Sequence, residues 1–404
     1  MTHPASLRRK RVLVDATPLW ATSGLRGIGR FLRDLLAGLA AVRGQHPELE
    51  IEAIRALSPT QAAVTADLSA VLAESADKGG SIGALQRHLR RAVMPAVMLR
   101  ARADLLHLPE IVGTPLVLPA PMVATCHDLI PLRYPEHYLP TQELAPRVGR
   151  AHREAAYAVR WVKDQRRYRL ARRVVAISSL TRDDLVKILK IPSERIDVVH
   201  NGITLHRYED QGVPSAPRHP RPFILYVGFS DPRKNIPALF ATLARLNARA
   251  PVDLVWAGDI KGKNRDNIVA LAAAHGVSER LKLAGFVSDA ELVVLYQQAM
   301  ALVFLSRIEG FGLPVVEGMA AGCPVIVARG SGSDELVGEA GVHVSADDPS
   351  EAAEAVWRVV DDAALRARLK REGPTQAGLF SSEAMATGYV HAWRRALGLD
   401  AASA

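Results

Sequence analysis

Residues 304–327 read as a strand, a glycine-rich turn and the start of a helix: Phe304-Leu-Ser-Arg-Ile-Glu-Gly-Phe-Gly-Leu-Pro-Val-Val-Glu-Gly-Met-Ala-Ala-Gly-Cys-Pro-Val-Ile-Val327. The strand ends at Leu305, and Pro314 suits the first position of a helix, where a missing N–H group costs no hydrogen bond. Gly310 and Gly312 allow backbone N–H groups to approach a ligand closely, and the start of a helix favours anions. The stretch therefore predicts an anion-binding turn.

Two carboxylates accompany this turn. Glu309 lies in the loop, and Glu317 follows eight residues later in the first helical turn. Carboxylates beside an anion site suit a ligand with phosphate at one point and neutral hydroxyls at another, because carboxylate oxygens accept hydrogen bonds from hydroxyls. The alternative is that Glu317 only complements the helix dipole and Glu309 is an ordinary loop residue. The spacing and the glycines together favour the ligand.

A second strand–turn–helix signal is Tyr226-Val-Gly-Phe-Ser-Asp-Pro-Arg-Lys-Asn-Ile-Pro237. The strand ends at Gly228, and Arg233 and Lys234 precede the helix. Two cations near a helix N-terminus suit a diphosphate. A surface Arg-Lys pair is otherwise common, so this signal is weak by itself.

Short apolar strands alternate with helical patterns along most of the chain, which predicts an α/β fold of parallel sheets covered on both faces. Ligands are then expected at the carboxyl ends of the strands of Rossmann-like domains. In the second half we expect strands at 223–228, 252–258, 281–285, 301–305 and 324–327, and helices at 237–249, 264–275, 289–298 and 314–321. In the first half we expect strands at 11–15, 50–54, 104–107, 121–125, 174–177 and 196–199, and helices at 28–40, 142–172 and 181–189.

Length and composition narrow the class of protein. The 404 residues, 49% of them hydrophobic and 23% charged, predict two globular domains. The boundary is expected near His200-Asn-Gly202, before a proline-rich linker. Two cysteines, Cys126 and Cys323, exclude a disulfide framework and a cysteine-based zinc site. No apolar run is long enough to span a membrane, and the stretch before Asp15 is too short for a signal peptide, so we expect a cytoplasmic protein.

The positive charge is uneven. Residues 1–205 carry a net charge of +11 and residues 206–404 carry −2. The basic half suggests an anionic partner, although arginine can also act as a plain solubilising residue. The basic stretches 84–102 and 147–173 could be amphipathic helices on an anionic membrane surface or solvated helices with an apolar stripe in the core. The packed helix is favoured for 147–173, and the two readings stay open for 84–102.

With these motifs the chain resembles the retaining, nucleotide-sugar-dependent glycosyltransferases of family 4, which have the GT-B fold. The resemblance covers about residues 120–345, and it is looser in the N-terminal part. The matching motifs are the Glu309 and Glu317 pair with its Gly-Phe-Gly-Leu-Pro turn, Arg233-Lys-Asn235, Ala176-Ile-Ser-Ser-Leu-Thr-Arg-Asp-Asp-Leu185, Val198-Val-His-Asn-Gly-Ile203 and Gly285-Phe-Val-Ser-Asp-Ala-Glu-Leu292.

The resemblance implies two Rossmann-like domains that face each other across a cleft. Residues 1–204 would form the N-terminal acceptor-binding domain and residues 205–378 the nucleotide-sugar-binding domain. Residues 379–404 would contain a last helix, at about 382–396, that returns to the N-terminal domain.

The resemblance also implies roles for individual residues. Glu309 would hold hydroxyls of the donor sugar, Glu317 the ribose hydroxyls, and Arg233 with Lys234 the diphosphate. Further donor-binding positions are Gly310, Phe311, Gly312 and Leu313 in the turn, Phe286 and Val287 against the base, and Gly27 and Gly29 in a first loop that approaches the phosphates or the acceptor. His127 matches a histidine near the transferred sugar, although a His-Asp pair at a strand end can also be structural.

Two departures from the family pattern stand out. Many members have a Pro-Glu pair after the second glycine-rich turn, whereas this chain has Ser331-Gly-Ser-Asp-Glu-Leu336, which leaves roles for Ser333 and Glu335 open. An Asp-x-Asp motif that would hold a metal at the diphosphate is missing. We therefore expect no metal and no cofactor beyond the nucleotide-sugar substrate, since Arg233, Lys234 and two helix N-termini supply the positive field.

The expected function is transfer of a sugar, with retention, to a glycan or lipid-linked acceptor in cell-surface polysaccharide synthesis. The motifs most resemble bacterial mannosyl- and rhamnosyltransferases, so GDP-mannose is the expected donor. The alternatives are a nucleotide-sugar epimerase or glucan synthase of the same fold, and a catalytically silent, membrane-attached partner subunit. A nucleic-acid partner is not expected, because no nucleic-acid motif occurs and aromatic residues are only 5% of the chain. Peripheral contact with the inner face of the cytoplasmic membrane is an open possibility.

Overall fold

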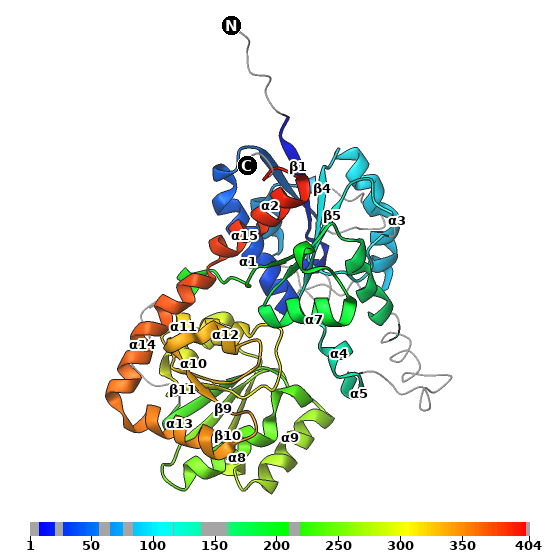
Figure 1. Ribbon diagram of the computed structural model, residues 1–404. Coiled ribbons are helices and arrows are strands. Elements are labelled where there is room, and N and C mark those ends of the chain that lie inside the picture. Colours follow the sequence, from blue (N-terminus) through cyan, green and yellow to red (C-terminus); the bar gives the residue numbers. More distant parts are fainter. Residues whose placement is uncertain are drawn as a thin grey trace. The chain divides into compact units, whose positions relative to one another are not determined.

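The structure is a computed structural model that describes residues 8–20, 27–55, 65–75, 84–115, 117–138, 159, 161–209 and 219–400, with the backbone alone for 84–90. The chain divides into two compact units (Figure 1). Unit 1 is Met1–Gly202 together with Ser381–Ala404, and unit 2 is Ile203–Phe380. The sequence had suggested boundaries after residues 204 and 378.

The sheet of unit 1 has the order β3-β2-β1-β4-β5-β6-β7 in the described part of the chain. Every neighbouring pair is parallel except β2 and β3. The strands are β1 (Lys10–Asp15), β2 (Leu49–Ile54), β3 (Thr65–Ala66), β4 (Leu105–Leu108), β5 (Met122–Cys126), β6 (Arg173–Ala176) and β7 (Ile196–Val198). These bounds agree with the strands expected from the sequence to within one residue, and the short β3 was not anticipated.

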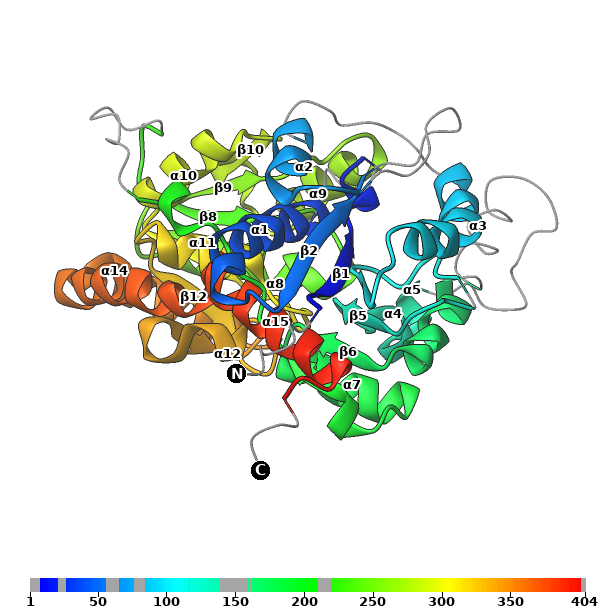
Figure 2. The ribbon, with the colours of Figure 1, turned by 90° about the horizontal axis from the view of Figure 1, so that it is seen from above.

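Helices cover both faces of this sheet, because side chains alternate along each strand. On one face Val12 and Val14 of β1 join a core with α1 (Gly27–Val42), α2 (Leu68–Ser75) and α15 (Ser382–Leu397). On the other face Leu13 joins a core with α3 (Ala84–Arg100) and α7 (Ser179–Leu189). Figure 2 shows α1 and α3 on opposite sides of β1 and β2. Two short helices, α4 (Ile130–Arg133) and α5 (Pro135–Tyr138), follow β5.

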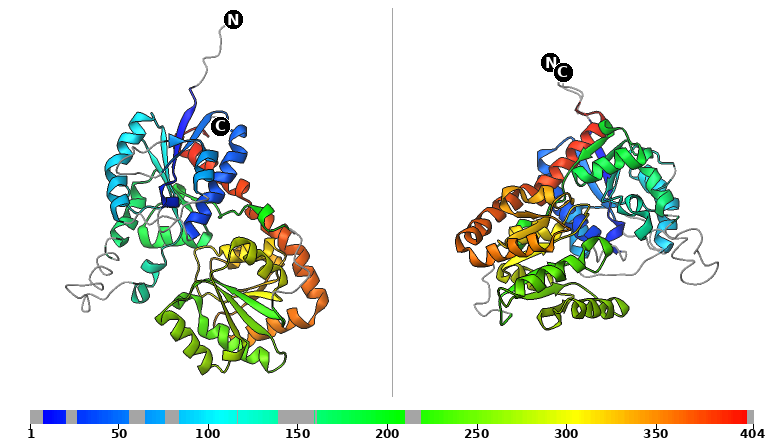
Figure 3. Two further views of the ribbon diagram at one scale, coloured as in Figure 1. Left: turned by 180° about the vertical axis from the view of Figure 1, so that it is seen from behind. Right: turned by 60° about the horizontal axis from the view of Figure 1, so that its bottom comes forward.

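The last helix, α15, is part of unit 1 and runs beside α1 (Figure 3). Gly38 of α1 makes this close packing possible, since a Cβ atom there would come within 2.0 Å of the Ser382 carbonyl oxygen. Ser381 caps the helix by accepting a hydrogen bond from Ala384 N at 3.0 Å. The buried carboxylate of Asp197 on β7 pairs with Arg395 of α15 at 2.5 Å, which ties the chain terminus to the sheet.

The sheet of unit 2 is entirely parallel in its described residues and has the order β10-β9-β8-β11-β12-β13. The strands are β8 (Phe223–Val227), β9 (Asp253–Ala257), β10 (Leu281–Gly285), β11 (Ala301–Phe304), β12 (Val325–Ala328) and β13 (Val342–Val344). From β8 the chain adds β9 and β10 on one side of the sheet, whereas β11, β12 and β13 follow on the other side. The winding of the chain therefore reverses between β8 and β11. That reversal is the switch point at which doubly wound sheets bind ligands.

The helices of unit 2 connect these strands. They are α8 (Ile236–Asn247), α9 (Lys263–Ala274), α10 (Asp289–Gln298), α11 (Leu313–Ala320), α12 (Asp334–Val337), α13 (Pro349–Asp361) and α14 (Ala363–Ala377). α8 packs against α13, and α11 packs against α14. The elements α12, α13, α14 and β13 were not predicted from the sequence.

Two expectations from the sequence need correction. The helix expected at 28–40 is α1, which starts at Gly27, so Gly27 and Gly29 lie in a helix and not in the loop that the resemblance implied. Phe31 and Leu32 of this helix are buried in the core. The helix expected at 142–172 lies mostly outside the described residues. Its described part is helical at 161–165, becomes a 3-10 helix at Arg166–Leu170 and ends before β6.

The basic stretch 84–102 is largely the helix α3. Its residues Met94, Val97 and Met98 are buried in the core of unit 1, whereas Leu99 is 65% exposed. The apolar stripe of α3 thus packs against the sheet. Within the described ranges, none of the helices combines the length and the apolar character that crossing a membrane requires.

Candidate functional site

The cationic turn after β8 is held in place by its own neighbours. Asp231 caps it by accepting a hydrogen bond from Arg233 N at 3.1 Å, and Pro232–Lys234 form one 3-10 turn. Asn235 ends this turn in the left-handed conformation, with φ of +55°, and its side chain donates to the Ala346 carbonyl at 2.6 Å. The helix α8 starts directly afterwards, so the two cations stand where the sequence predicted them.

The loop after β11 brings Glu309 onto both cations. One carboxylate oxygen of Glu309 accepts a hydrogen bond from Lys234 Nζ at 2.5 Å, and the other pairs with Arg233 Nη1. Arg233 also donates to the Ile308 carbonyl at 3.3 Å. The ring of Phe304 lies 4.7 Å from Lys234 Nζ and adds a cation–π contact. Three residues predicted separately therefore form one cluster at the switch point of the sheet.

Burial and charge oppose each other within this cluster. Burial favours the neutral form of Glu309, but Lys234 and Arg233 outweigh it and lower the pKa of the carboxyl group below its ordinary value. Burial lowers the pKa of Lys234, and Glu309 counteracts it in part. Glu309 is ionised at neutral pH, and an ionised carboxylate can only accept hydrogen bonds.

The glycine-rich turn is packed tightly against a second turn. Gly312 has φ of +118°, and a Cβ atom there would lie 2.7 Å from the Cβ of Ser333. Gly332 N donates to the Glu309 carbonyl at 3.1 Å, and a Cβ on Gly332 would come within 2.1 Å of that oxygen. Ser333 thus supports the turn that carries Glu309, which answers part of the question left open by the sequence. Glu335 lies in α12, and no role for it follows.

Glu317 is buried in α11 and is 1% exposed. Its carboxylate accepts a hydrogen bond from the hydroxyl of Tyr296 in α10 at 3.0 Å. Tyr296 was not predicted from the sequence, because nothing in the local pattern of α10 indicates a partner for a residue 21 positions away. Helix α11 begins at Leu313 with Pro314 in its first turn, one residue earlier than expected.

The aromatic residues of these loops differ in exposure. Phe311 is 3% exposed, and its ring lies 6.0 Å from that of Phe380, so this predicted donor-binding side chain is buried against another aromatic ring. Phe286 is 81% exposed and Phe229 is 55% exposed. They follow the ends of β10 and β8, on either side of the end of β9. Phe286 was among the predicted donor-binding residues, together with Val287, whereas Phe229 was not.

In unit 1 the ring of His127 follows β5 and lies edge-on to Phe31 of α1, with 4.8 Å between the ring centroids. The structure therefore brings together His127 and the segment that contains Gly27 and Gly29. His127 Nε2 lies 2.8 Å from the Pro109 carbonyl oxygen, which can only accept, so Nε2 carries the proton. Burial lowers the pKa of His127 to about 4. Its imidazole is neutral at pH 7 and can accept a hydrogen bond through Nδ1.

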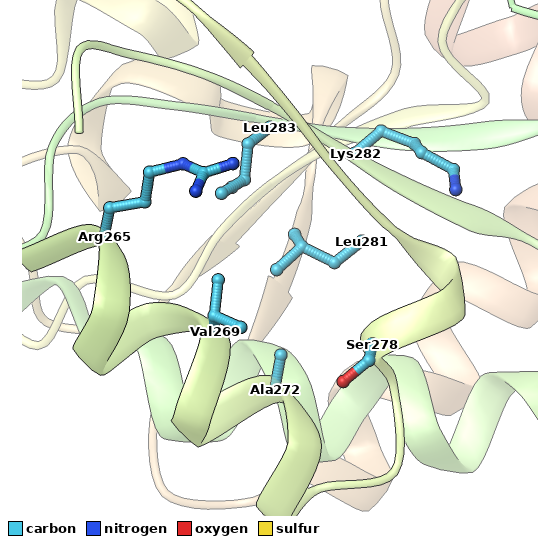
Figure 4. Close-up of a pocket in the computed structure, with 7 residues that line it drawn as sticks. All are labelled: Arg265, Val269, Ala272, Ser278, Leu281, Lys282 and Leu283. Carbon is cyan, nitrogen blue, oxygen red and sulfur yellow. The ribbon is translucent and has the colours of Figure 1, made fainter. Parts of the chain in front are cut away.

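A pocket of about 310 Å³ lies elsewhere in unit 2, between α9 and β10 (Figure 4). Its lining is apolar apart from Arg265, Lys282 and Ser278. The residues of the Glu309 cluster do not line it, so it is separate from the candidate site. Among the residues that the structure describes, histidine, cysteine, aspartate and glutamate do not gather in threes as a metal ion would need.

Two family models match the chain. The model described as "Glycosyltransferase Family 4" matches residues 25–207, and the model described as "Glycosyl transferases group 1" matches residues 209–376. The two matches together cover most of both units and include the Glu309 cluster. The chain belongs to the family 4 glycosyltransferases.

Curated relatives of this glycosyltransferase match parts of its length. The serotype-specific mannosyltransferase WbdA of Escherichia coli is 29% identical over 65% of this chain and 32% of its own length. The O-antigen chain mannosyltransferase B of Escherichia coli is 26% identical over 55% of this chain and 61% of its own length. A glycogen synthase of Mycobacterium tuberculosis is 31% identical over 54% of this chain and 53% of its own length. The alignments thus span from a third to about three fifths of the relatives.

Solved structures establish the fold of this glycosyltransferase. A glycosyltransferase from Rickettsia africae has a TM-score of 0.68 at 16% identity, covering 96% of this chain and 99% of its own. A sucrose-phosphate synthase from Thermosynechococcus elongatus also has a TM-score of 0.68, at 19% identity, covering 97% and 100%. The fold is GT-B, as the sequence predicted.

Proposed function

We propose that this protein is a retaining glycosyltransferase that moves a sugar from a nucleotide diphosphate donor to a glycan or lipid-linked acceptor. The observation that carries the proposal is the cluster of Arg233, Lys234 and Glu309 where β8 and β11 end. Two cations and one carboxylate, held beside two helix N-termini, suit a ligand that is anionic at one end and rich in hydroxyls at the other.

The cations would bind the diphosphate. The sugar–phosphate bond breaks as charge builds up on the leaving phosphate, and fixed positive groups at that point lower the barrier. Arg233 and Lys234 are held by contacts with Asp231, Glu309 and the Phe304 ring. Such preorganisation avoids the cost of arranging the charges during the reaction.

Glu309 would change partners when the donor binds. Its two oxygens pair with Arg233 and Lys234. A diphosphate that draws these cations toward itself would release carboxylate oxygens for the hydroxyls of the donor sugar. Glu309 would then orient the sugar, whereas Glu317, held by Tyr296, would bind the ribose that donor and product share.

Retention fits the family resemblance. The leaving phosphate would accept the proton of the acceptor hydroxyl as that hydroxyl attacks from the same face, so the sugar–oxygen bond forms where the sugar–phosphate bond breaks. A neutral His127 at pH 7 would act as a hydrogen-bond acceptor and not as the acid. Unit 1 would provide the acceptor site.

Mannose from GDP-mannose is the proposed donor group, and cell-surface polysaccharide the proposed product. The support is the similarity to two mannosyltransferases, one of them named for O-antigen chains. A glucosyl donor is the second candidate, since a glycogen synthase is 31% identical over 54% of this chain. A catalytically silent partner subunit is less well supported, because Arg233, Lys234, Glu309 and Glu317 are all present.

A donor panel tests the proposal. Thermal shift and calorimetry with GDP-mannose, UDP-glucose, ADP-glucose, GDP and UDP should show stabilisation by the GDP compounds, because a bound ligand stabilises the folded state by mass action. If GDP is released only when a glycan acceptor is added, the reaction is transfer and not epimerisation. Stabilisation by the glucose donors alone would replace mannose with glucose, and no stabilisation by any compound would overturn the proposal.

The two glutamates make a sharper test. Glu317→Ala should weaken GDP-mannose and GDP alike, by the ~1.5–3 kcal/mol typical of hydrogen bonds to charged groups. Glu309→Ala should keep GDP binding and lose most turnover, because the sugar is no longer oriented. A fully active Glu309→Ala protein would mean that the assigned site is wrong.

Peripheral membrane contact is proposed for unit 1, and its support is the charge of +11 in residues 1–205 together with the exposed Leu99 on α3. Sedimentation with vesicles that contain anionic lipid should decrease as salt increases, because exposed charges are screened. Absence of binding to these vesicles at low salt would contradict membrane contact.

A further inference from the structure

Both ring nitrogens of His343 face hydrogen-bond acceptors. His343 lies in the middle of β13, and its Nδ1 is 2.6 Å from an oxygen of Asp334. Its Nε2 is 2.9 Å from the carbonyl oxygen of Gly338. A carbonyl oxygen can only accept, and so can an ionised carboxylate. The geometry therefore suits the imidazolium form, in which both nitrogens carry a proton.

Asp334 connects this histidine to the turn before α12. The second carboxylate oxygen of Asp334 accepts a hydrogen bond from Gly330 N at 2.9 Å. The backbone N of Asp334 donates to the Ser331 carbonyl at 3.0 Å. Gly330 has φ of +75°, so Asp334 closes a turn that starts in the left-handed conformation.

The same turn supports the glycine-rich loop of the candidate site. Gly332 N donates to the Glu309 carbonyl, and Ser333 fills the space that the missing side chain of Gly312 leaves. Ser331 donates to the Ala328 carbonyl at 3.0 Å and lies 2.7 Å from the Ser333 hydroxyl. A continuous set of contacts thus leads from His343 through Asp334 and this turn to the backbone of Glu309.

The pair of Asp334 and His343 includes a position at which this chain departs from the family pattern. Many family members carry proline before the glutamate of this segment, whereas this chain carries Asp334 before Glu335. A proline stiffens a turn by fixing φ, and it has no side chain that could bind a histidine. Here the turn is held by a carboxylate that pairs with His343 instead.

We propose that His343 is a positioning residue, which in its protonated form holds the 330–334 turn against the Glu309–Gly312 loop and so makes donor binding depend on pH. Loss of the proton removes one of the two N–H donors. Histidine is the side chain that exchanges its proton near neutral pH. The dependence on donor binding rests on the function proposed above, whereas the ordering of the turn does not.

Other charged groups around His343 pair with each other or with the backbone. Arg329 donates to the His343 carbonyl at 2.7 Å and to Glu351 on α13 at 2.8 Å. That pairing raises the pKa of Arg329 and lowers the pKa of Glu351. Arg368 of α14 donates to the backbone of Glu339 at 3.4 Å. The contacts to Asp334 and Gly338 therefore depend on the protons of His343 itself.

Two variants separate the roles of the two donors. His343→Asn keeps an N–H donor near the Nδ1 position toward Asp334 and has no proton to lose. His343→Leu removes both donors. His137→Asn in unit 1 is the matched control, since it removes an exposed histidine that lies in the other unit.

The first readout is hydrogen exchange of the peptides that cover 306–313 and 328–338, corrected for the intrinsic pH dependence of exchange. In the wild-type protein these peptides should lose protection roughly three- to tenfold between pH 6 and pH 8.5, the effect of one hydrogen bond. His343→Asn should flatten this dependence, and His343→Leu should be unprotected throughout. Equal protection in wild type and His343→Leu would overturn the proposal.

The second readout is calorimetric affinity for GDP and UDP over the same pH range. The ratio of wild-type to His343→Asn affinity cancels the titration of the nucleotide phosphate itself, and it should fall roughly three- to tenfold as the pH rises. A constant ratio would overturn the link to the donor site. If neither nucleotide binds either protein, the proposed function fails, and hydrogen exchange alone decides whether His343 positions the turn.

Discussion

Lys234 Nζ and a carboxylate oxygen of Glu309 lie 2.5 Å apart in the interior of unit 2, although the two residues are 75 positions apart in the chain. Both side chains are more than nine-tenths buried. A buried ion pair contributes little net stability, because its attraction is offset by the loss of hydration of both charges. Its presence where two strands end is therefore better explained by a ligand that uses the charges.

Removal of Glu309 should destabilise the folded protein. Glu309→Ala leaves Lys234 buried without its carboxylate, which costs up to about 3–5 kcal/mol in the free energy of unfolding. The double variant Glu309→Ala with Lys234→Met should recover much of this loss, because no buried charge then remains unpaired at that position. Urea denaturation of the single and double variants measures the coupling between them. Additive losses would mean that the two residues do not stabilise each other.

The cations should matter more for turnover than for nucleoside binding. Arg233→Ala and Lys234→Ala should each lower kcat roughly 100-fold, since they stabilise charge that develops on the leaving phosphate. Affinity for the nucleoside without phosphates should change little. Arg371→Ala is the matched control, because that side chain is 72% exposed and pairs with Glu372 on α14. Equal losses in nucleoside affinity and turnover would point to a general structural role.

Gly312 should not tolerate a side chain. Gly312→Ala places a Cβ atom 2.7 Å from Ser333 in a backbone conformation with φ of +118°, so we expect a loss of about 1–3 kcal/mol in stability and weaker donor binding. Gly330→Ala is the control, because Gly330 also has positive φ but has no atoms within 4 Å of the added Cβ. A smaller loss for Gly312→Ala than for Gly330→Ala in thermal unfolding would contradict the close packing of the two turns.

Unit 1 should lose stability in mild acid because of His107. This histidine is fully buried on β4 between Thr125 and the rings of Tyr389 and Trp393. Burial, with a smaller contribution from His127, lowers its pKa to about 3. The unfolded chain takes up a proton near pH 6.5 and the folded one does not, so the stabilisation is complete above pH 6.5 and is lost as the pH falls toward 3. The expected loss from pH 7 to pH 5 is about 2 kcal/mol.

Hydrogen exchange of peptides from β4 and β5 reports this loss for unit 1 separately from unit 2. His107→Phe serves as the control, since it keeps an aromatic ring against Tyr389 and Trp393 and has no proton to gain. Its stability should depend less on pH than that of the wild type. Identical pH profiles for the two proteins would remove His107 as the cause.

Donor binding should not require a metal ion. The expectation depends on Arg233 and Lys234 as the positive groups at the diphosphate and on the missing Asp-x-Asp motif. Turnover should be unchanged after exhaustive EDTA treatment and dialysis. Activity that disappears and returns only with Mg²⁺ or Mn²⁺ would show that Arg233 and Lys234 do not suffice as positive groups at the diphosphate.

The local pattern of the sequence was enough to predict most strands and the turns that carry the site. A strand, a glycine-rich turn and a helix follow one another within residues 304–327, and the information lies in adjacent residues. At Gly27–Phe31 the helix expected from the residue pattern is confirmed, whereas the glycine-containing loop that the resemblance implied is wrong. A glycine allows a loop but does not require one. The core contacts of Phe31 outweigh the free-energy cost of placing glycine in a helix.

The sequence by itself therefore determined the α/β class, the family, and which residue types stand at the carboxyl ends of β8 and β11. Only the tertiary structure decided that Glu309 contacts Arg233 and Lys234, that Glu317 contacts Tyr296, and that Asp334 contacts His343. Strand and turn signals arise from neighbouring residues, so they can be read along the chain. The contacts depend on which strands lie side by side, and in a parallel sheet that order is set by crossover connections and by the packing of helices on both faces.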